Sequence, residues 1–282
     1  MKPSPIATVP DAIIDRTCMV NGVFGETGVG KSYQTEKEIK LIVQPIPGQK
    51  SPRKVLMFDT NGEYTKFPAI TQKQIEGGYF DRAAAARINA QGLPPEKKKE
   101  MAMRLCQTFY NGHMFIDDID NFNSYSRDQD YIGALMGARH KGLDLTIIHQ
   151  SLEMAVPNFW RNVTTIRLHQ QASGDKELKE RSKGKFPILK IASIIVENQY
   201  RAGNIRFFVN IHLRNLKIYG MPYKDEFEKA VQKFLILNPE YMKEDIAEIS
   251  ITHNASKLNG NLKSLGLAKA TQRFMQYHGQ SL

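Results

Sequence analysis

The chain has 282 residues, 41% of them hydrophobic and 24% charged, which is an ordinary composition for a globular protein and excludes wholesale disorder. Its 39 Lys and Arg residues outnumber its 29 Asp and Glu residues and give a formal net charge of +10. A field of this sign favours polyanions or acidic membrane surfaces as partners, so nucleic acid is the first partner to test.

Two further features predict a cytoplasmic protein. The cysteines, Cys18 and Cys106, lie far apart in apolar surroundings, which argues against a disulfide scaffold or a zinc site. The N-terminal residues contain no apolar core followed by a small-residue cleavage site. Residues 186–196, the most apolar later stretch, are interrupted by Lys190 and are too few to span a bilayer.

Short apolar or β-branched runs alternate with helical stretches, which predicts an α/β fold with a mainly parallel sheet and helices on both faces. These runs are residues 18–24, 55–59, 114–118, 145–149 and 163–168.

The character of the chain changes after the fifth run. Residues 193–198, 204–213 and 215–220 predict an antiparallel extension on the edge of the main sheet. Residues 225–237 have the apolar spacing of a helix, and residues 253–282 form a basic tail with no Asp or Glu. We therefore expect a core domain with its edge extension at residues 1–222 and a helical, basic appendage at residues 223–282.

The segment GETGVGKS, residues 25–32, has the strand–loop–helix context of a phosphate-binding loop. Its glycines allow successive backbone N–H groups to point inward and to form a nest for the β-phosphate at the helix N-terminus. Lys31 is expected to reach the β and γ oxygens of ATP, and Ser32 is expected to offer its hydroxyl to Mg²⁺. The predicted nucleotide contacts are Gly25, Glu26, Thr27, Gly28, Val29, Gly30, Lys31, Ser32 and Tyr33.

Such a site needs an acidic group at the end of another strand to hold the magnesium shell, and two segments offer one. Asp59 in VLMFDTNGEY fits the Asp-x-x-Gly switch of GTPases, but the chain has no Asn-Lys-x-Asp sequence to read guanine. HMFIDDID is the better candidate, because its strand delivers Asp117 to the magnesium and Asp118 to the position of a water-orienting base. The other interpretation of these acids is a solvated loop after a strand.

Asp118 departs from the usual residue at its position, and Gln150 has two possible interpretations. Motor ATPases usually carry Glu where this chain has Asp118, so the shorter arm must come closer to the water, or hydrolysis is slow without a partner. Gln150 ends another strand and is suited to bond the attacking water or the γ-phosphate. The alternative for residues 149–151 is a helix N-cap run.

Three segments together resemble the FtsK–HerA superfamily of DNA-pumping ATPases: VLMFDTNGEY, HMFIDDID and ARHKGLDLTIIHQS. In the third segment Arg139, Gly142 and Gln150 follow the order seen in that family, and VPNFWRNVTTIRLH is similar to its next loop and strand. The compact genome-packaging ATPases of membrane-containing icosahedral viruses resemble the chain most, over roughly residues 19–168.

The resemblance implies a RecA-like fold with an additional strand and a homo-oligomeric ring, a hexamer, with nucleotide between subunits. It also implies an arginine that reaches from the neighbouring subunit towards the γ-phosphate, for which Arg139 and Arg161 are the candidates.

The expected function is an ATP-hydrolysing motor that translocates DNA, with viral genome packaging as its task and a capsid vertex or membrane protein as a further partner. Residues 172–220 hold ten Lys and Arg against four Asp and Glu, and KELKERSKGK within them is suited to grip phosphates without reading sequence. The same run also fits a solvated charged loop. The alternatives for function are a Zot-type assembly ATPase of filamentous phage, a GTPase switch and a nucleotide kinase.

Overall fold

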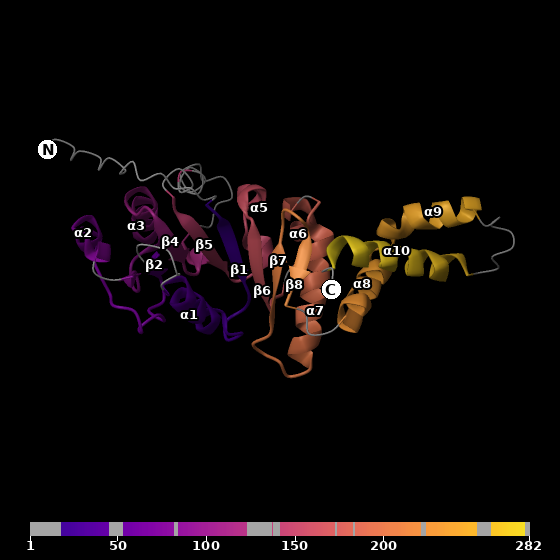
Figure 1. Cartoon of the computed structure of the whole chain (residues 1–282), viewed down its shortest axis with the longest axis horizontal. Helices are drawn as coiled ribbons and strands as arrows, with labels where there is room; N and C mark the ends of the chain where they lie inside the picture. The colour runs from indigo at the N-terminus through magenta and orange to yellow at the C-terminus, as the bar shows by residue number, and fades with distance from the viewer. Residues whose placement is uncertain are drawn as a thin grey trace. The chain divides into compact units, whose positions relative to one another are not determined.

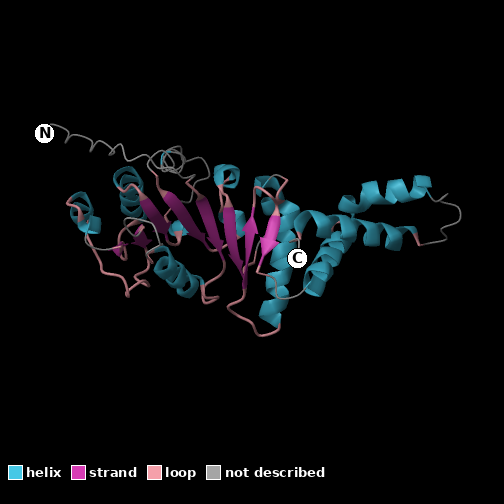
Figure 2. Cartoon of the chain, viewed as in Figure 1, coloured by secondary structure: helices cyan, strands magenta, loops and turns pink. Residues whose placement is uncertain are grey.

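A computed structural model describes residues 18–44, 53–81, 84–122, 137, 142–172, 174–182, 184–220, 224–252 and 261–279. The described strands form an eight-stranded sheet in the order β3-β2-β4-β5-β1-β6-β7-β8, drawn in magenta in Figure 2. The chain divides into two compact units. The first comprises residues up to 23, 31–150 and 154–163, and the second comprises residues 24–30, 151–153 and from 164 onward. The predicted domain boundary between residues 222 and 223 stays a prediction.

The first unit contains the parallel part of the sheet. β2 pairs in parallel with β3 and β4, and β4 pairs in parallel with β5; β2, β4 and β5 are seen side by side in Figure 1. Its elements, with the end of β1 belonging to the second unit, are β1 (Val20–Phe24), α1 (Lys31–Ile42), β2 (Lys54–Asp59), α2 (Gln72–Glu76), η1 (Tyr79–Asp81), β3 (Ala85–Asn89), α3 (Pro95–Thr108), β4 (Gly112–Ile116), η2 (Ile119–Asn121), β5 (Asp144–His149) and α5 (Pro157–Asn162).

Helices cover both faces of these strands, as the sequence predicts. Successive strand residues point to opposite faces, and Phe115 of β4 packs in a buried cluster with Ile39 of α1. The preceding residue, Met114, faces the other way, and its sulfur lies 3.8 Å from that of Cys106 in α3. Each such fully buried apolar side chain stabilises the fold by roughly 1.5–3 kcal/mol.

The register places the carboxyl ends of three strands at one edge of the first unit. Phe58 of β2 is opposite Ile116 of β4, and Ile116 is opposite Ile147 of β5. The polar residues that end or follow these strands therefore gather at that edge.

The second unit combines the predicted antiparallel extension with a group of helices. β7 pairs antiparallel with both β6 and β8. The helices α8, α9 and α10 pack together and run from orange to yellow in Figure 1. The elements are η3 (Leu152–Met154, whose last residue belongs to the first unit), β6 (Thr165–His169), α6 (Asp175–Ser182), α7 (Phe186–Arg201), β7 (Phe208–His212), β8 (Lys217–Tyr219), α8 (Lys224–Leu237), η4 (Pro239–Met242), α9 (Lys243–Thr252) and α10 (Leu262–His278).

The prediction of a strand at residues 193–198 is wrong, because these residues lie inside the helix α7. A continuous apolar run fits a buried strand and a buried helix equally well by periodicity. The run is apolar on more than one face because α7 packs against β6, β7 and β8 as well as against α8. Burial on two sides removes the polar stripe that identifies a surface helix.

The sequence analysis also missed β3, which pairs in parallel with β2. The segment AARIN has a single β-branched residue and little apolar alternation, so its strand conformation depends on pairing rather than on propensity. Among the described helices, none has both the length and the apolar character needed to cross a bilayer.

Candidate active site

The phosphate-loop segment joins β1 to α1, so the strand–loop–helix context expected of it is present. Gly28 and Gly30 have φ values of +87° and +90°, a region that side chains other than glycine rarely adopt. The backbone N–H of Glu26 donates to the carbonyl of Gln170 at 2.9 Å, and the Glu26 carboxylate accepts from the N–H of Ala172 at 2.6 Å. The loop is thus tied to the segment that follows β6.

The first two residues of α1 are Lys31 and Ser32. Burial lowers the pKa of Lys31, and the negative charges of Asp117 and Asp118 oppose that shift. The nearby acids therefore favour the charged lysine that a phosphate contact requires. Thr27 and Tyr33 are exposed, whereas Val29 is buried.

Asp117 follows β4 and is 4% exposed. Burial raises the pKa of Asp117 to about 8, with smaller increases from the charges of Glu63, Asp118 and Asp59 and an opposing effect from Lys31. Its Oδ2 atom is buried and accepts no hydrogen bond from the residues that the structure describes. A buried carboxylate with a spare oxygen and acidic neighbours is suited to a cation.

Mg²⁺ fits this group. It binds through one or two carboxylates together with water and substrate phosphates, so a dedicated protein cage is not required. The described residues contain no cluster of three or more His, Cys, Asp or Glu side chains able to hold a metal by themselves.

Glu63 lies beside the predicted magnesium ligand Ser32, and sequence reasoning gave it no role. The Ser32 hydroxyl donates to Glu63 Oε2 at 2.5 Å. A hydroxyl that donates its proton in this way keeps its lone pairs for a metal. The signal was present in the segment DTNGEY, but only the contact shows which of its polar residues reaches Ser32.

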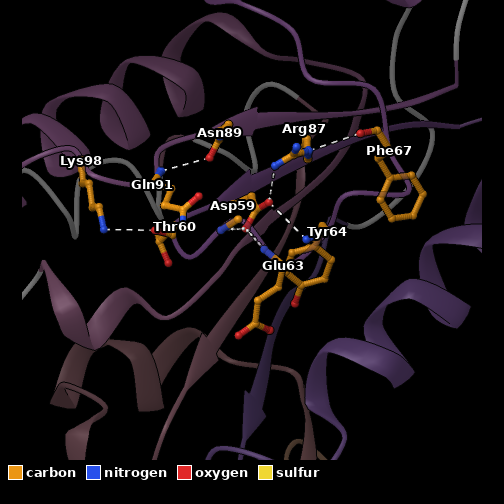
Figure 3. A network of polar contacts seen from close by, with 10 residues as sticks. Asp59, Thr60, Glu63, Tyr64, Phe67, Arg87, Asn89, Gln91 and Lys98 are labelled. Carbon is orange, nitrogen blue, oxygen red and sulfur yellow. Dashed lines mark hydrogen bonds and ion pairs between the residues drawn. The ribbon is translucent and has the colours of Figure 1, made fainter.

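Asp59 has a structural role that argues against its use as the magnesium acid (Figure 3). Its carboxylate is fully buried and accepts from the backbone N–H groups of Gly62, Glu63 and Tyr64 at 2.8, 3.0 and 3.2 Å. It also forms an ion pair of 2.8 Å with Arg87 of the unforeseen strand β3. Both oxygens are occupied in shaping the loop after β2, so the GTPase-switch interpretation of Asp59 loses its basis.

Asp118 lies at the centre of a group of amides. Its Oδ1 accepts from Gln150 Nε2 at 3.0 Å, and its Oδ2 accepts from Asn61 Nδ2 at 3.2 Å and from Asn121 Nδ2. Its backbone is left-handed, with φ 43° and ψ 51°. Non-glycine residues adopt that region rarely, and they do so disproportionately at functional sites.

Asp120, to which sequence reasoning also gave no role, fixes the end of β5. Its two oxygens accept from the backbone N–H of Gln150 at 2.8 Å and contact His149 Nδ1 at 2.7 Å. The structure thus brings Gln150 to Asp118, and it places His149 in the support of the site. Ser151 directly precedes the turn η3, so the helix N-cap alternative stays open for that residue.

The structure describes only one of the two candidate arginines, Arg161. Arg161 is exposed on α5 and donates to Asn158 at 3.2 Å. Arg139 lies outside the described residues. Sequence reasoning also overlooked Arg206, whose side chain lies against the phosphate loop. Its Cγ is 3.1 Å from the position that a Cβ on Gly30 would occupy.

The basic run KELKERSKGK is partly engaged in contacts of its own unit. Lys179 pairs with Glu240 at 2.9 Å, and the Arg181 guanidinium donates to the carbonyl of Glu153. The ion pair with Glu240 neutralises one positive charge of this run.

Comparison with known proteins gives two results. Residues 13–109 match the family model described as "Helicase HerA, central domain". Curated protein sequences provide no significant match.

Among solved structures, the genome packaging NTPase B204 of Sulfolobus turreted icosahedral virus 2 in complex with ATPγS is 15% identical, with a TM-score of 0.50 over 72% of this chain and 95% of B204. The DNA-packaging ATPase B204 of Sulfolobus turreted icosahedral virus is 14% identical, with a TM-score of 0.51 over 71% and 95% of the two chains. The AMPPCP complex of the former is 17% identical, with a TM-score of 0.50 over 72% and 96%.

At these identities the solved structures share the fold of this chain. The HerA match spans the phosphate loop and the loop after β2, and the described fold is that of a P-loop enzyme. Residues 13–109 thus resemble a HerA central domain, and the chain has the fold of the P-loop nucleoside triphosphatases.

Proposed function

We propose that this chain hydrolyses ATP and uses the free energy to translocate DNA, and that its task is to package a viral genome. The observation that carries the hydrolytic part is the arrangement at one edge of the first unit. There Lys31, at the start of α1, lies within electrostatic reach of Asp117 and Asp118, which follow β4, and the adjacent Ser32 hydroxyl donates to Glu63.

Each group has a distinct role in this proposal. Lys31 binds the β and γ oxygens of ATP, and Ser32 and Asp117 hold the side of the site where magnesium binds. Bound Mg²⁺ would neutralise charge on the β- and γ-phosphates. Asp118 orients the attacking water and accepts its proton, and Gln150 holds Asp118 rather than the water.

DNA is proposed as the moving partner on two grounds. The formal net charge of +10 favours a polyanion, and a charge field of this kind contacts phosphates without reading sequence. The B204 proteins that share the fold are described as genome packaging or DNA-packaging enzymes.

We further propose a homo-oligomeric ring, a hexamer by the resemblance, in which an arginine of one subunit stabilises charge at the neighbour's γ-phosphate. Arg161 is suited to this role because it is exposed. A capsid vertex or a membrane protein is the proposed docking partner of the ring.

The decisive experiment measures ATP hydrolysis with and without double-stranded DNA for the wild-type chain, Lys31→Ala and Asp118→Asn. We expect hydrolysis that DNA stimulates, loss of nucleotide binding in Lys31→Ala, and nucleotide binding with strongly reduced but measurable hydrolysis in Asp118→Asn. GTP in place of ATP tests the switch alternative. A rate that DNA does not change, in a protein that sediments as a monomer with nucleotide, would refute the motor.

A further inference from the structure

Asp118, which follows β4, is held by residues from the strands on both sides of β4. In the sheet, β4 lies between β2 and β5. Gln150, at the end of β5, donates to Oδ1 at 3.0 Å, whereas Asn61, in the loop after β2, donates to Oδ2 at 3.2 Å. The two oxygens are therefore fixed by amides from opposite neighbours.

The third amide cannot give the same orientation. Asn121 belongs to the short turn η2 that begins just after Asp118, so its contact is local and moves with that turn. Asn61 and Gln150 instead fix the position of the carboxylate relative to two neighbouring strands of the sheet. Hydrogen bonds to an ionised acceptor are stronger than neutral ones, which makes such a pair of amides an effective orienting device.

The loop that carries Asn61 is itself rigidly anchored. The buried carboxylate of Asp59 accepts the N–H groups of Gly62 and Glu63, the two residues that follow Asn61, and pairs with Arg87 of β3 (Figure 3). Gly62 has a φ of +76°, and a Cβ there would lie 2.5 Å from Oε1 of Gln91. The backbone at Asn61 is thus set by contacts that involve neither nucleotide nor metal.

We propose that Asn61 is a positioning residue for hydrolysis, acting through Asp118 as the counterpart of Gln150. Aspartate has a shorter arm than glutamate, so its carboxylate reaches the attacking water only if the surrounding structure holds it in one place. The left-handed backbone of Asp118 requires the same support. This inference rests on the proposed function, because it assigns Asn61 to the hydrolytic step.

The test is a set of steady-state and single-turnover measurements of ATP hydrolysis on the full chain. Asn61→Ala is expected to lower kcat about tenfold with KM within about twofold, because the phosphate contacts of Lys31 stay intact. Affinity for a fluorescent ATP analogue is expected to be unchanged. Asn61→Asp, which keeps the shape but replaces the donor by a repelling carboxylate, is expected to lower kcat at least as much.

Two controls separate positioning from general damage. Thr65→Ala removes an exposed side chain of the same loop and is expected to leave kcat, KM and Tm as in the wild type. In an Asp118→Asn background, Asn61→Ala is expected to cause no further loss, because the two residues act as one unit.

The outcomes also separate this inference from the proposed function. If the wild-type chain hydrolyses ATP and both Asn61 variants keep its kcat, Asn61 does not position Asp118. A further loss in the Asp118→Asn background, or a fall in nucleotide affinity together with Tm, would assign Asn61 a structural role and overturn the proposal. If the wild-type chain hydrolyses no nucleotide, the proposed function fails, and the assignment of Asn61 fails with it.

Discussion

Replacing Asp117 with asparagine is expected to stabilise the nucleotide-free protein while removing its Mg²⁺-dependent activity. Burial and the neighbouring acids raise the pKa of Asp117 from 3.8 to about 8, so the carboxyl binds its proton more tightly in the folded chain than in the unfolded chain. The folded state therefore loses stability as the pH rises from about 4 to about 8, and the neutral amide of asparagine escapes that loss.

The magnitude follows from the same shift. At pH 7 the unfolded carboxyl is about three pH units above its pKa of 3.8, and each unit is worth about 1.4 kcal/mol. Because folding must take up a proton at Asp117, its raised pKa opposes folding by up to about 4 kcal/mol at pH 7, and by about 1.5 kcal/mol at pH 5. Asp117→Asn should gain roughly this much stability, and the gain should grow by about 2–3 kcal/mol between the two pH values.

Urea unfolding at pH 5 and pH 7, without nucleotide or magnesium, measures the gain in stability of the first unit and its increase with pH. Asp225→Asn, followed in the unfolding of the second unit to which it belongs, is the control, because Asp225 is exposed and its pKa is lowered by a hydrogen bond from Lys229. It should show no gain that grows with pH. A gain for Asp117→Asn that is equal at the two pH values, or a loss at pH 7, would show that the raised pKa of Asp117 does not destabilise the folded chain.

Two further predictions concern the fold that supports the site. Asp59→Ala leaves Arg87 without its buried partner and releases the loop after β2, so the free energy of unfolding of the first unit should fall by about 3–5 kcal/mol in urea. A fall below about 1 kcal/mol would show that Asp59 does not anchor this loop. Ile195→Ala removes a side chain that is 1% exposed in α7 and should cost the second unit about 2–4 kcal/mol, whereas Tyr200→Ala, 41% exposed on the same helix, should cost less than about 0.5 kcal/mol. Equal costs for the two would mean that the helix faces are assigned wrongly.

Local patterns in the sequence were sufficient for the parts of the fold with strong periodicity or fixed chemistry. The phosphate loop depends on glycines at set positions and on a strand and a helix around it, all within residues 20–42. The strands β2 and β4 contain continuous apolar runs, residues 55–58 and 114–116, that burial on both faces explains, whereas β1, β5 and β6 have shorter apolar stretches interrupted by polar residues. The strands of the antiparallel extension, β7 and β8, were equally recognisable, because their apolar residues alternate with polar ones.

Long-range pairing decided what the patterns left open. The segment AARIN becomes β3 because it completes the edge of the sheet beside β2, and Arg87 in it then neutralises Asp59. Residues 193–198 become helical because α7 fills the space between β6–β8 and α8. Neither outcome is encoded in the propensity of the segment itself.

By itself, the sequence determined that this chain has a phosphate loop, an acid pair after an apolar strand and a polar residue at the end of another. Only the tertiary structure decided which of those residues has a structural role and which is available to the site. Asp59 and Asp117 both follow buried strands, yet backbone N–H groups and Arg87 occupy one of them and leave an oxygen of the other without a partner among the described residues. The role of a carboxylate depends on which donors reach it, and those donors come from segments far apart in the chain.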